Sequence, residues 1–233
     1  MINDKNIWLS YCLTNDTPLY GGRSENFNMY KTSSIKEGKV ANDTKIETTV
    51  HIGTHIDMPY HFYENGQTID DFDIDFWCFK SPLFMEFKPD DFIIKDDLIS
   101  RLEDIEDKAY DILIIKTGIC AFRDKEIFWK ENYGLAPEVY YYLLEKFPHI
   151  RVVGFDSISI SNWQDRALGK ISHQAFLNPK KPILVLEDMD LNNIDGKTKL
   201  KSILVSPLRI QECDGLPCTV FAQIDKEDIV DKS

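Results

Sequence analysis

The feature that most constrains this chain is a cluster of three of its five histidines within eleven residues. His51, His55 and His61 are accompanied there by one carboxylate, Asp57, and by Gly53. Neutral imidazole and carboxylate groups are the usual protein ligands of zinc, manganese and iron. A single histidine is more often a structural residue, but this density of ligand types in one short segment predicts a metal site.

The spacing of the cluster also limits its backbone conformation. His51, His55 and Asp57 have odd numbers and would share one face of an extended strand. Six residues of strand span about 20 Å, whereas the ligands of one ion lie about 2 Å from it, so the chain must bend between them. We therefore expect a strand over residues 45–50 that ends at His51 and curls round the metal. A helical His-x-x-x-His arrangement is the alternative, which the glycine and proline of the segment disfavour.

The segment His-x-Gly-Thr-His-x-Asp-x-Pro-x-His, residues 51–61, resembles the signature of the cyclase-like metal-dependent hydrolases, a family that includes bacterial kynurenine formamidases and isatin hydrolases. All eleven positions match, and Phe62 follows as it often does in that family. Weaker similarity extends over most of the chain, at residues 9–21, 111–118, 152–159, 172–177, 183–191, 206–209 and 214–217.

Carried over residue by residue, the resemblance implies a set of metal ligands. His51, His55 and Asp57 would bind a first ion. His173 and Glu187 would bind a second, with Asp57 bridging the two. The segment between His173 and Glu187 is longer than the family pattern, so one or two ions per chain both remain open. The donor set suits zinc and manganese about equally.

The remaining chemistry falls to His61, which the resemblance identifies as the acid–base residue. A bound divalent metal lowers the pKa of water to about 7, and amide cleavage additionally needs a proton delivered to the departing nitrogen. Imidazole, with an ordinary pKa of about 6.5, suits that transfer. The alternative for His61 is a third histidine ligand.

Glu187 directly follows an apolar run over residues 182–186, which is typical of a buried strand. A carboxylate that is buried there needs a metal or another partner.

Strands and helices alternate along the chain, which predicts an α/β fold. The strand-like runs are residues 7–13, 45–51, 82–87, 111–117, 151–155, 182–187, 200–205 and 219–224, and helical patterns cover residues 95–102, 137–147 and 172–177. The run 112–115 is apolar on both faces, as in a central strand. The family resemblance implies a swivelling β/β/α barrel-like fold with mixed sheets, formed by residues 1–233 as a single domain.

Composition excludes several classes of partner. A net charge of −12 disfavours nucleic acid and anionic membranes. The five cysteines are scattered and odd in number, so we expect no disulfide framework and a cytoplasmic protein. Neither a signal peptide nor an apolar run of membrane-spanning length is expected.

The polar segment of residues 21–42 is long for a structureless loop, and long loops are often lids or binding loops. We expect a lid over the active site or an arm exchanged between subunits, with plain surface as the alternative. The resemblance implies a homodimer or homotetramer.

Together these observations predict a metal-dependent hydrolase that cleaves a linear or cyclic amide of a small molecule. An arylformamide such as N-formylkynurenine is the most specific substrate that the resemblance implies. The alternatives are a metal-dependent cyclase or dehydratase of a biosynthetic pathway, and a non-catalytic metal-binding protein on the same scaffold.

Overall fold

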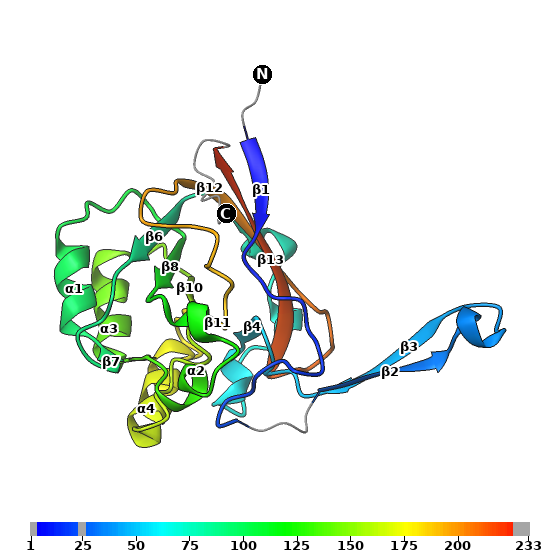
Figure 1. The fold of residues 1–233 in the computed structure, drawn as a ribbon. Helices are drawn as coiled ribbons and strands as arrows, with labels where there is room; N and C mark the ends of the chain where they lie inside the picture. The colour runs from blue at the N-terminus through cyan, green and yellow to red at the C-terminus, as the bar shows by residue number, and fades with distance from the viewer. Residues whose placement is uncertain (1–3, 23–26, 226–233) are drawn as a thin grey trace.

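The computed structural model describes residues 4–22 and 27–225. One mixed sheet dominates it, as Figure 1 shows. Its strands follow the order β5 (Cys78–Phe79), β12 (Leu200–Pro207), β13 (Gly215–Asp225), β4 (His55–Asp57), β11 (Leu184–Glu187), β10 (Val152–Phe155), β8 (Ile112–Lys116) and β6 (Pro82–Glu86), and β1 (Asp4–Trp8) pairs with β13.

The sheet has a parallel half and an antiparallel half. Strands β6, β8, β10 and β11 run parallel to one another, whereas β4, β12, β13, β5 and β1 pair antiparallel. β12 also lies against β6, so the sheet curls back on itself into a nearly closed barrel. The expected α/β fold with a mixed, barrel-like sheet is confirmed.

Helices cover the outer side of the parallel half (Figure 1). They are α1 (Asp96–Glu103), α2 (Ile127–Lys130), α3 (Pro137–Lys146) and α4 (Arg166–Phe176), beside a small parallel pair of strands, β7 (Ile93–Ile94) and β9 (Gly134–Leu135). Short 3-10 turns lie at η1 (Ile35–Glu37), η2 (Pro59–His61), η3 (Ile69–Asp71), η4 (Ile74–Trp77) and η5 (Ile119–Phe122). The predicted helices at 95–102 and 137–147 are confirmed, and residues 172–177 are the last part of the longer α4.

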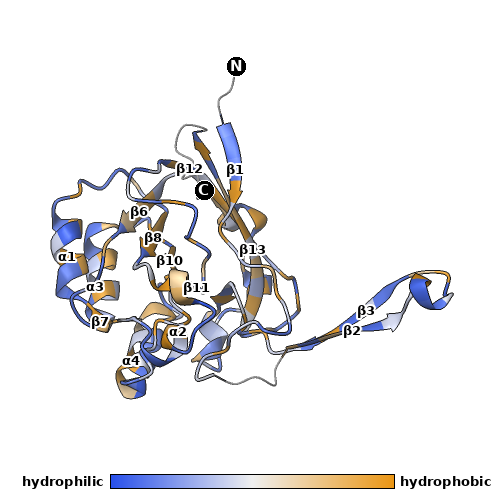
Figure 2. Cartoon of the chain, viewed as in Figure 1, coloured by the Kyte–Doolittle hydropathy of each residue, from blue (hydrophilic) through white to orange (hydrophobic). Residues whose placement is uncertain are grey.

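The core lies between the parallel strands and these helices. The four residues of β8 from Ile112 to Ile115 are fully buried, as the run of apolar residues on both faces predicts. Pro137 begins α3, where its missing N–H costs no helix hydrogen bond, and Val139 and Leu143 of the same helix are completely buried. Figure 2 shows the apolar colour concentrated on the inner strands and the polar colour on the outer faces of the helices.

The segment of residues 27–48 is an antiparallel hairpin formed by β2 (Phe27–Ser33) and β3 (Asp43–Thr48). It projects away from the rest of the molecule (Figure 1), and we call it the arm. Part of it falls in the segment expected to be a polar loop, of which residues 23–26 lie outside the described residues. Both faces of the arm are exposed, so its sequence carries no alternation of apolar and polar residues that would predict β2.

The strand expected at residues 45–51 ends earlier and belongs elsewhere. It stops at Thr48 and pairs only within the arm, whereas the metal-ligand motif supplies a separate strand, β4, to the main sheet. The bend predicted from the ligand spacing is therefore present, but it lies between two strands rather than at the end of one. No helix among residues 4–22 and 27–225 is long and apolar enough to cross a membrane.

Candidate metal centre

The short strand β4 carries two of the predicted ligands on one side. It is fully buried between β13 and β11, with His55 opposite Glu187 in the register. The chain reaches β4 through a turn at Gly53, whose φ of 57° lies in the left-handed region. A Cβ atom there would also approach the end of the Leu13 side chain at 2.4 Å, so both the backbone conformation and the packing favour glycine at this position.

Two buried histidines are oriented by backbone carbonyl groups. His55 Nδ1 lies 2.8 Å from the carbonyl oxygen of Gly53, and His173 Nδ1 of α4 lies 2.9 Å from that of Gly169. A carbonyl oxygen only accepts hydrogen bonds, so each Nδ1 carries the proton when the ring is neutral. Each Nε2 then has a free lone pair. Metal-binding histidines are usually oriented in this way, by a hydrogen bond from the other ring nitrogen to a carbonyl or carboxylate group.

Both Nε2 atoms face the same two carboxylates. His55 Nε2 lies 3.5 Å from Asp57 Oδ1 and 3.4 Å from Glu187 Oε2, while His173 Nε2 lies 3.4 Å from Asp57 Oδ2 and 3.5 Å from Glu187 Oε1. These separations are long for hydrogen bonds. They match the spacing of about 3.4 Å between tetrahedral ligands that each lie about 2.1 Å from one zinc ion.

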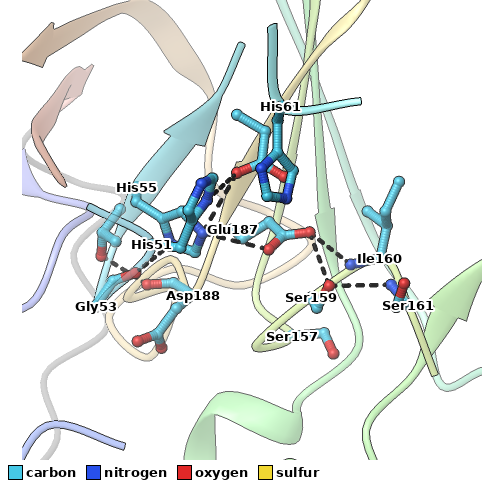
Figure 3. A network of polar contacts seen from close by, with 12 residues as sticks. His51, Gly53, His55, His61, Ser157, Ser159, Ile160, Ser161, Glu187 and Asp188 are labelled. Atoms are coloured by element: carbon cyan, nitrogen blue, oxygen red, sulfur yellow. Dashed lines mark hydrogen bonds and ion pairs between the residues drawn. The ribbon is translucent and has the colours of Figure 1, made fainter. Parts of the chain in front are cut away.

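Glu187 is also held from the opposite side, as Figure 3 shows. Its Oε1 accepts hydrogen bonds from the backbone N–H of Ile160 at 2.7 Å and from the hydroxyl of Ser159 at 3.1 Å. These bonds fix the carboxylate while its Oε2 remains directed at His55. The family resemblance groups Glu187 with His173 and a bridging Asp57, and in the structure Glu187 also lies 3.4 Å from His55.

Burying charged groups costs free energy unless other charges or hydrogen bonds compensate for the lost water contacts. Asp57 is 1% exposed and Glu187 is 3% exposed, so two carboxylates lie almost completely out of water. Burial opposes protonation of His173, yet Asp57 and Glu187 outweigh it and raise the pKa of His173 to about 10. Burial likewise opposes ionisation of Asp57, but His51 and His173 hold its pKa well below the usual range. The cluster therefore attracts positive charge, either protons or a metal cation.

His51 and His61 lie beside this cluster and share a carboxylate to which the sequence motifs gave no role. Asp214 Oδ2 lies 2.9 Å from His51 Nε2 and 3.0 Å from His61 Nδ1. The other nitrogen of His51, Nδ1, lies 2.8 Å from Asp57 Oδ1. Both ring nitrogens of His51 are thus occupied by carboxylates, and the ring would have to exchange one contact to bind a metal.

The same contacts shift the pKa values of His51 and Asp214. Burial disfavours charge on His51, yet Asp57 and Asp214 raise its pKa to about 10. Hydrogen bonds with His51 and His61 lower the pKa of Asp214 below its usual range. Asp214 is therefore ionised and orients His61, whose Nε2 has no hydrogen-bond partner among the described residues.

A second buried ion pair supports the loop that follows β11. The guanidinium of Arg123 donates two hydrogen bonds to Asp188, at 2.7 and 2.6 Å, and lies over the ring of Tyr11 at 3.9 Å. The Asp188 carbonyl accepts a hydrogen bond from Thr54 at 2.6 Å. Asp188 has a φ of 50°, so these contacts hold a residue other than glycine in the left-handed region directly after Glu187.

The cluster opens into a cavity of about 670 Å³. Its polar floor includes His51, His55, Asp57, His61, His173 and Glu187, so all six predicted site residues line one space. Leu19, Ile52, Phe62 and Ile158 form apolar walls. The fifth histidine, His149, is exposed and lies outside the cavity lining. A volume in this range and a wall of this kind suit a small organic molecule.

The donor set fits a divalent cation. Two imidazole nitrogens and two carboxylates converge at ligand spacing, and two further histidines stand next to them. Asp214, Asp188 and Ser159 were not assigned from the sequence, because each acts through a residue distant in the chain. Asp214 lies in the matching segment of residues 214–217, but the resemblance assigned no role to it.

The sequence profile of a protein family described as "Putative cyclase" matches residues 7–162. The kynurenine formamidase of Bacillus cytotoxicus is 29% identical over 191 residues, which cover 81% of this chain and 83% of that protein. A solved structure described as a potential metal-dependent hydrolase with cyclase activity is similar with a TM-score of 0.73 at 23% identity, over 96% of this chain and 98% of that one. Isatin hydrolase A from Labrenzia aggregata has a TM-score of 0.75 at 18% identity, over 96% of this chain and 95% of that one. The profile matches well over half of the residues, and the chain therefore belongs to this cyclase family.

Proposed function

We propose that the protein is a metal-dependent hydrolase that cleaves an amide bond of a small molecule, with an arylformamide such as N-formylkynurenine as the most specific candidate. The observation that carries the proposal is the convergence of buried imidazole and carboxylate ligands beside the His61–Asp214 pair, on the floor of one cavity. Similarity to a relative named kynurenine formamidase supports the choice of substrate.

His55, Asp57, His173 and Glu187 would hold zinc or manganese, as one or two ions per chain, with His51 as a further ligand. Bound there, a divalent ion supplies a Lewis acid for the carbonyl oxygen and lowers the pKa of water to about 7. The carbonyl groups of Gly53 and Gly169 keep both Nε2 atoms directed into the centre. The backbone N–H of Ile160 donates a hydrogen bond to Glu187 and keeps this carboxylate in place beside the other charged groups of the cluster.

His61 performs the proton transfers of the proposed reaction. Its Nδ1 is held by Asp214, which leaves Nε2 to accept a proton from the attacking water and to return it to the departing nitrogen. Water adds to the carbonyl carbon, the carbon–nitrogen bond breaks, and the nitrogen leaves as a neutral amine. For an arylformamide the products are formate and an aromatic amine.

The cavity walls suit an aromatic amide. Phe62 stacks on the ring of His173 with a centroid separation of 4.8 Å, which positions a flat apolar surface directly beside the cluster. Leu19, Ile52 and Ile158 provide the remaining apolar contacts. A planar ring therefore has a place to bind next to the reacting carbonyl.

Formate release from N-formylkynurenine by protein loaded with Zn²⁺ or Mn²⁺, with metal-free protein as the control, tests this function. We expect metal-dependent turnover with kcat/KM above about 10⁴ M⁻¹s⁻¹, the low end for enzymes. Absence of turnover with metal bound would reject the formamidase activity and direct attention to cyclic amides, ring closure and dehydration.

Substitution of the His61–Asp214 pair distinguishes an enzyme from a non-catalytic metal protein. We expect His61→Ala to lower kcat about a hundredfold or more, because a positioned acid–base group contributes at least that much. Asp214→Asn should lower kcat by a similar order, and both variants should retain their metal. Loss of metal, with the unfolding temperature of metal-free wild-type protein, would instead identify His61 as a ligand.

We further propose that the arm binds a second copy of the chain in a homodimer or homotetramer. Met29 and Ile46 lie opposite each other in its register, and they are 42% and 56% exposed. A two-stranded hairpin alone is only marginally stable in water, so its apolar side chains require a partner. The arm has four lysines against three acidic residues, whereas the whole chain has a charge of −12, which favours contact with the body of another copy.

A further inference from the structure

Two basic residues stand in the wall of the cavity that contains the metal centre. Arg166 and Lys170 of α4 line the same space as His173 and Glu187. They precede His173 by seven and three residues on one helix, so all three side chains lie on nearly the same helical face. The helix therefore presents a cationic strip that leads from the solvent to the centre.

Neither cation is paired with a carboxylate of the described residues. The side chains of Arg166 and Lys170 form no ion pair or hydrogen bond with any residue in the described ranges 4–22 and 27–225, although Arg166 lies over the ring of Trp163 at 5.4 Å. The acidic neighbour Asp165 is engaged in capping α4 through the N–H of Leu168. Because the chain is strongly acidic, two unpaired cations facing one cavity are not explained by the general charge of the surface.

A positive charge at the start of α4 does not stabilise this helix. Arg166 is the first residue of the helix, and no acidic residue occupies the first turn. A positive charge near this end is opposed by the helix macrodipole. Arg166 therefore lowers the stability of its own helix slightly, and a ligand that pairs with it would offset that cost.

The guanidinium of Arg166 is close enough to affect another wall of the cavity. Burial raises the pKa of the Tyr20 hydroxyl to about 12, and the charge of Arg166 acts in the opposite direction. Tyr20 packs edge-on against Trp163 at 5.2 Å, so the Trp163 ring contacts both Tyr20 and Arg166, two residues that line the cavity.

The distances along α4 set the size of the ligand. With a rise of 1.5 Å per residue, Lys170 lies about 4.5 Å and Arg166 about 10 Å from His173 along the helix axis. A charged group that pairs with these side chains would lie about one aromatic ring away from an amide at the metal centre. Leu19, Ile52 and Phe62 provide apolar lining in the same cavity.

We propose that Arg166 and Lys170 bind a carboxylate of the substrate, which restricts the enzyme to aromatic amides that carry a negative charge at the end remote from the scissile bond. This rests on the proposed function. The guanidinium offers a planar pair of donors that matches a carboxylate, and Lys170 adds a second charge. The cationic strip would also offset the repulsion between the substrate's carboxylate and an acidic protein.

A matched pair of substrates tests the proposal. The α-carboxamide analogue of N-formylkynurenine keeps the size and shape of the substrate but replaces its carboxylate by a neutral group. We expect the wild-type protein to prefer the carboxylate about ten- to a hundredfold in kcat/KM, as hydrogen bonds to charged groups allow. The variant Arg166→Gln/Lys170→Gln should raise KM for the carboxylate by a similar factor, leave its kcat nearly unchanged, and not affect the carboxamide.

The control is Arg101→Gln/Lys108→Gln, which removes the same charge from exposed positions outside the cavity. Arg101 also lies over an aromatic ring, that of Phe87, at 4.9 Å, so each double variant removes one cation from an aromatic face. The control should leave all constants unchanged. Equal kcat/KM for both substrates in the wild type, or an equal effect of the control substitutions, would overturn the proposal and leave the hydrolase function intact.

A binding measurement separates this proposal from the function on which it rests. Calorimetric titration with kynurenine and with kynurenine amide requires no turnover. Tighter binding of kynurenine that disappears in the Arg166→Gln/Lys170→Gln variant would support the carboxylate site even if no formamide were hydrolysed. Equal binding of the two compounds by the wild type would reject it.

Discussion

The metal centre and the arm differ in what holds their side chains in place. In the centre, Asp57, His173 and Glu187 are almost fully buried, and each is fixed by contacts from at least two separate elements. In the arm, β2 and β3 pair with each other and with no other strand of the described residues, and nearly all their side chains are exposed. The fold of one chain thus determines the geometry of the centre, whereas no contact within the described residues covers Met29 and Ile46 of the arm.

From this contrast we expect that removing a charge has the largest effect on metal binding and turnover where the charged group is most deeply buried. Asp57→Asn keeps the side chain's volume and removes a negative charge shared by His55 and His173. We expect metal binding to be lost and turnover to fall by about a thousandfold or more, because metal-ion catalysis contributes several kcal/mol. Activity assays and metal analysis of the purified variant provide the measurement.

The matched control for this change is Asp16→Asn, at an exposed position outside the cavity. It should leave metal content and turnover unchanged. Full activity of Asp57→Asn would show that the buried carboxylate is structural.

A smaller effect is expected at the ion pair that supports the centre from outside. Arg123→Gln would leave the Asp188 carboxylate, which is 1% exposed, without its bidentate partner. Breaking a buried pair in this way costs about 3–5 kcal/mol of unfolding free energy. Urea unfolding followed by circular dichroism measures this change.

The comparison variant, Lys130→Gln, removes an exposed pair with Glu126 on α2. Such pairs contribute about 0.3–0.5 kcal/mol. Equal destabilisation of the two variants would mean that Arg123 does not support the loop after β11.

The smallest effect on the fold is expected in the arm. Met29→Ser/Ile46→Ser replaces two apolar side chains that face the same side of the hairpin. We expect little change in the far-ultraviolet circular dichroism spectrum but a shift towards monomers in sedimentation velocity, because these side chains would pack against another copy of the chain. Asn28→Ala, at the adjacent position on the opposite face, should preserve the assembly. An unchanged sedimentation coefficient of the double variant would exclude the arm as an interface.

Much of the fold follows from local patterns. The apolar runs at residues 112–116, 152–155 and 184–187 form β8, β10 and β11, because a strand covered on both faces requires apolar residues throughout. The helix beginning at Pro137 has a recognisable first residue and apolar spacing. By contrast β2 was missed, since a strand exposed on both faces has no alternation to detect.

The candidate site divides in the same way. His51, His55, Asp57 and His61 were identifiable because they lie within eleven residues, and their grouping with His173 and Glu187 came from the family resemblance. Asp214 lies 153 positions from His61, and Asp188 lies 65 positions from Arg123. Contacts over such separations depend on the order of the strands in the sheet, which no local pattern encodes.

Titration of Mn²⁺ or Zn²⁺ into metal-free protein, followed by calorimetry and by the thermal unfolding midpoint, tests most directly whether the buried cluster is a metal centre. We expect saturable binding of one or two ions per chain, a rise in the midpoint of about 10 °C at a thousandfold excess over Kd, and disappearance of both effects in His55→Ala. Absence of saturable binding in the wild type, or an identical titration for His55→Ala, would contradict a metal centre at this cluster.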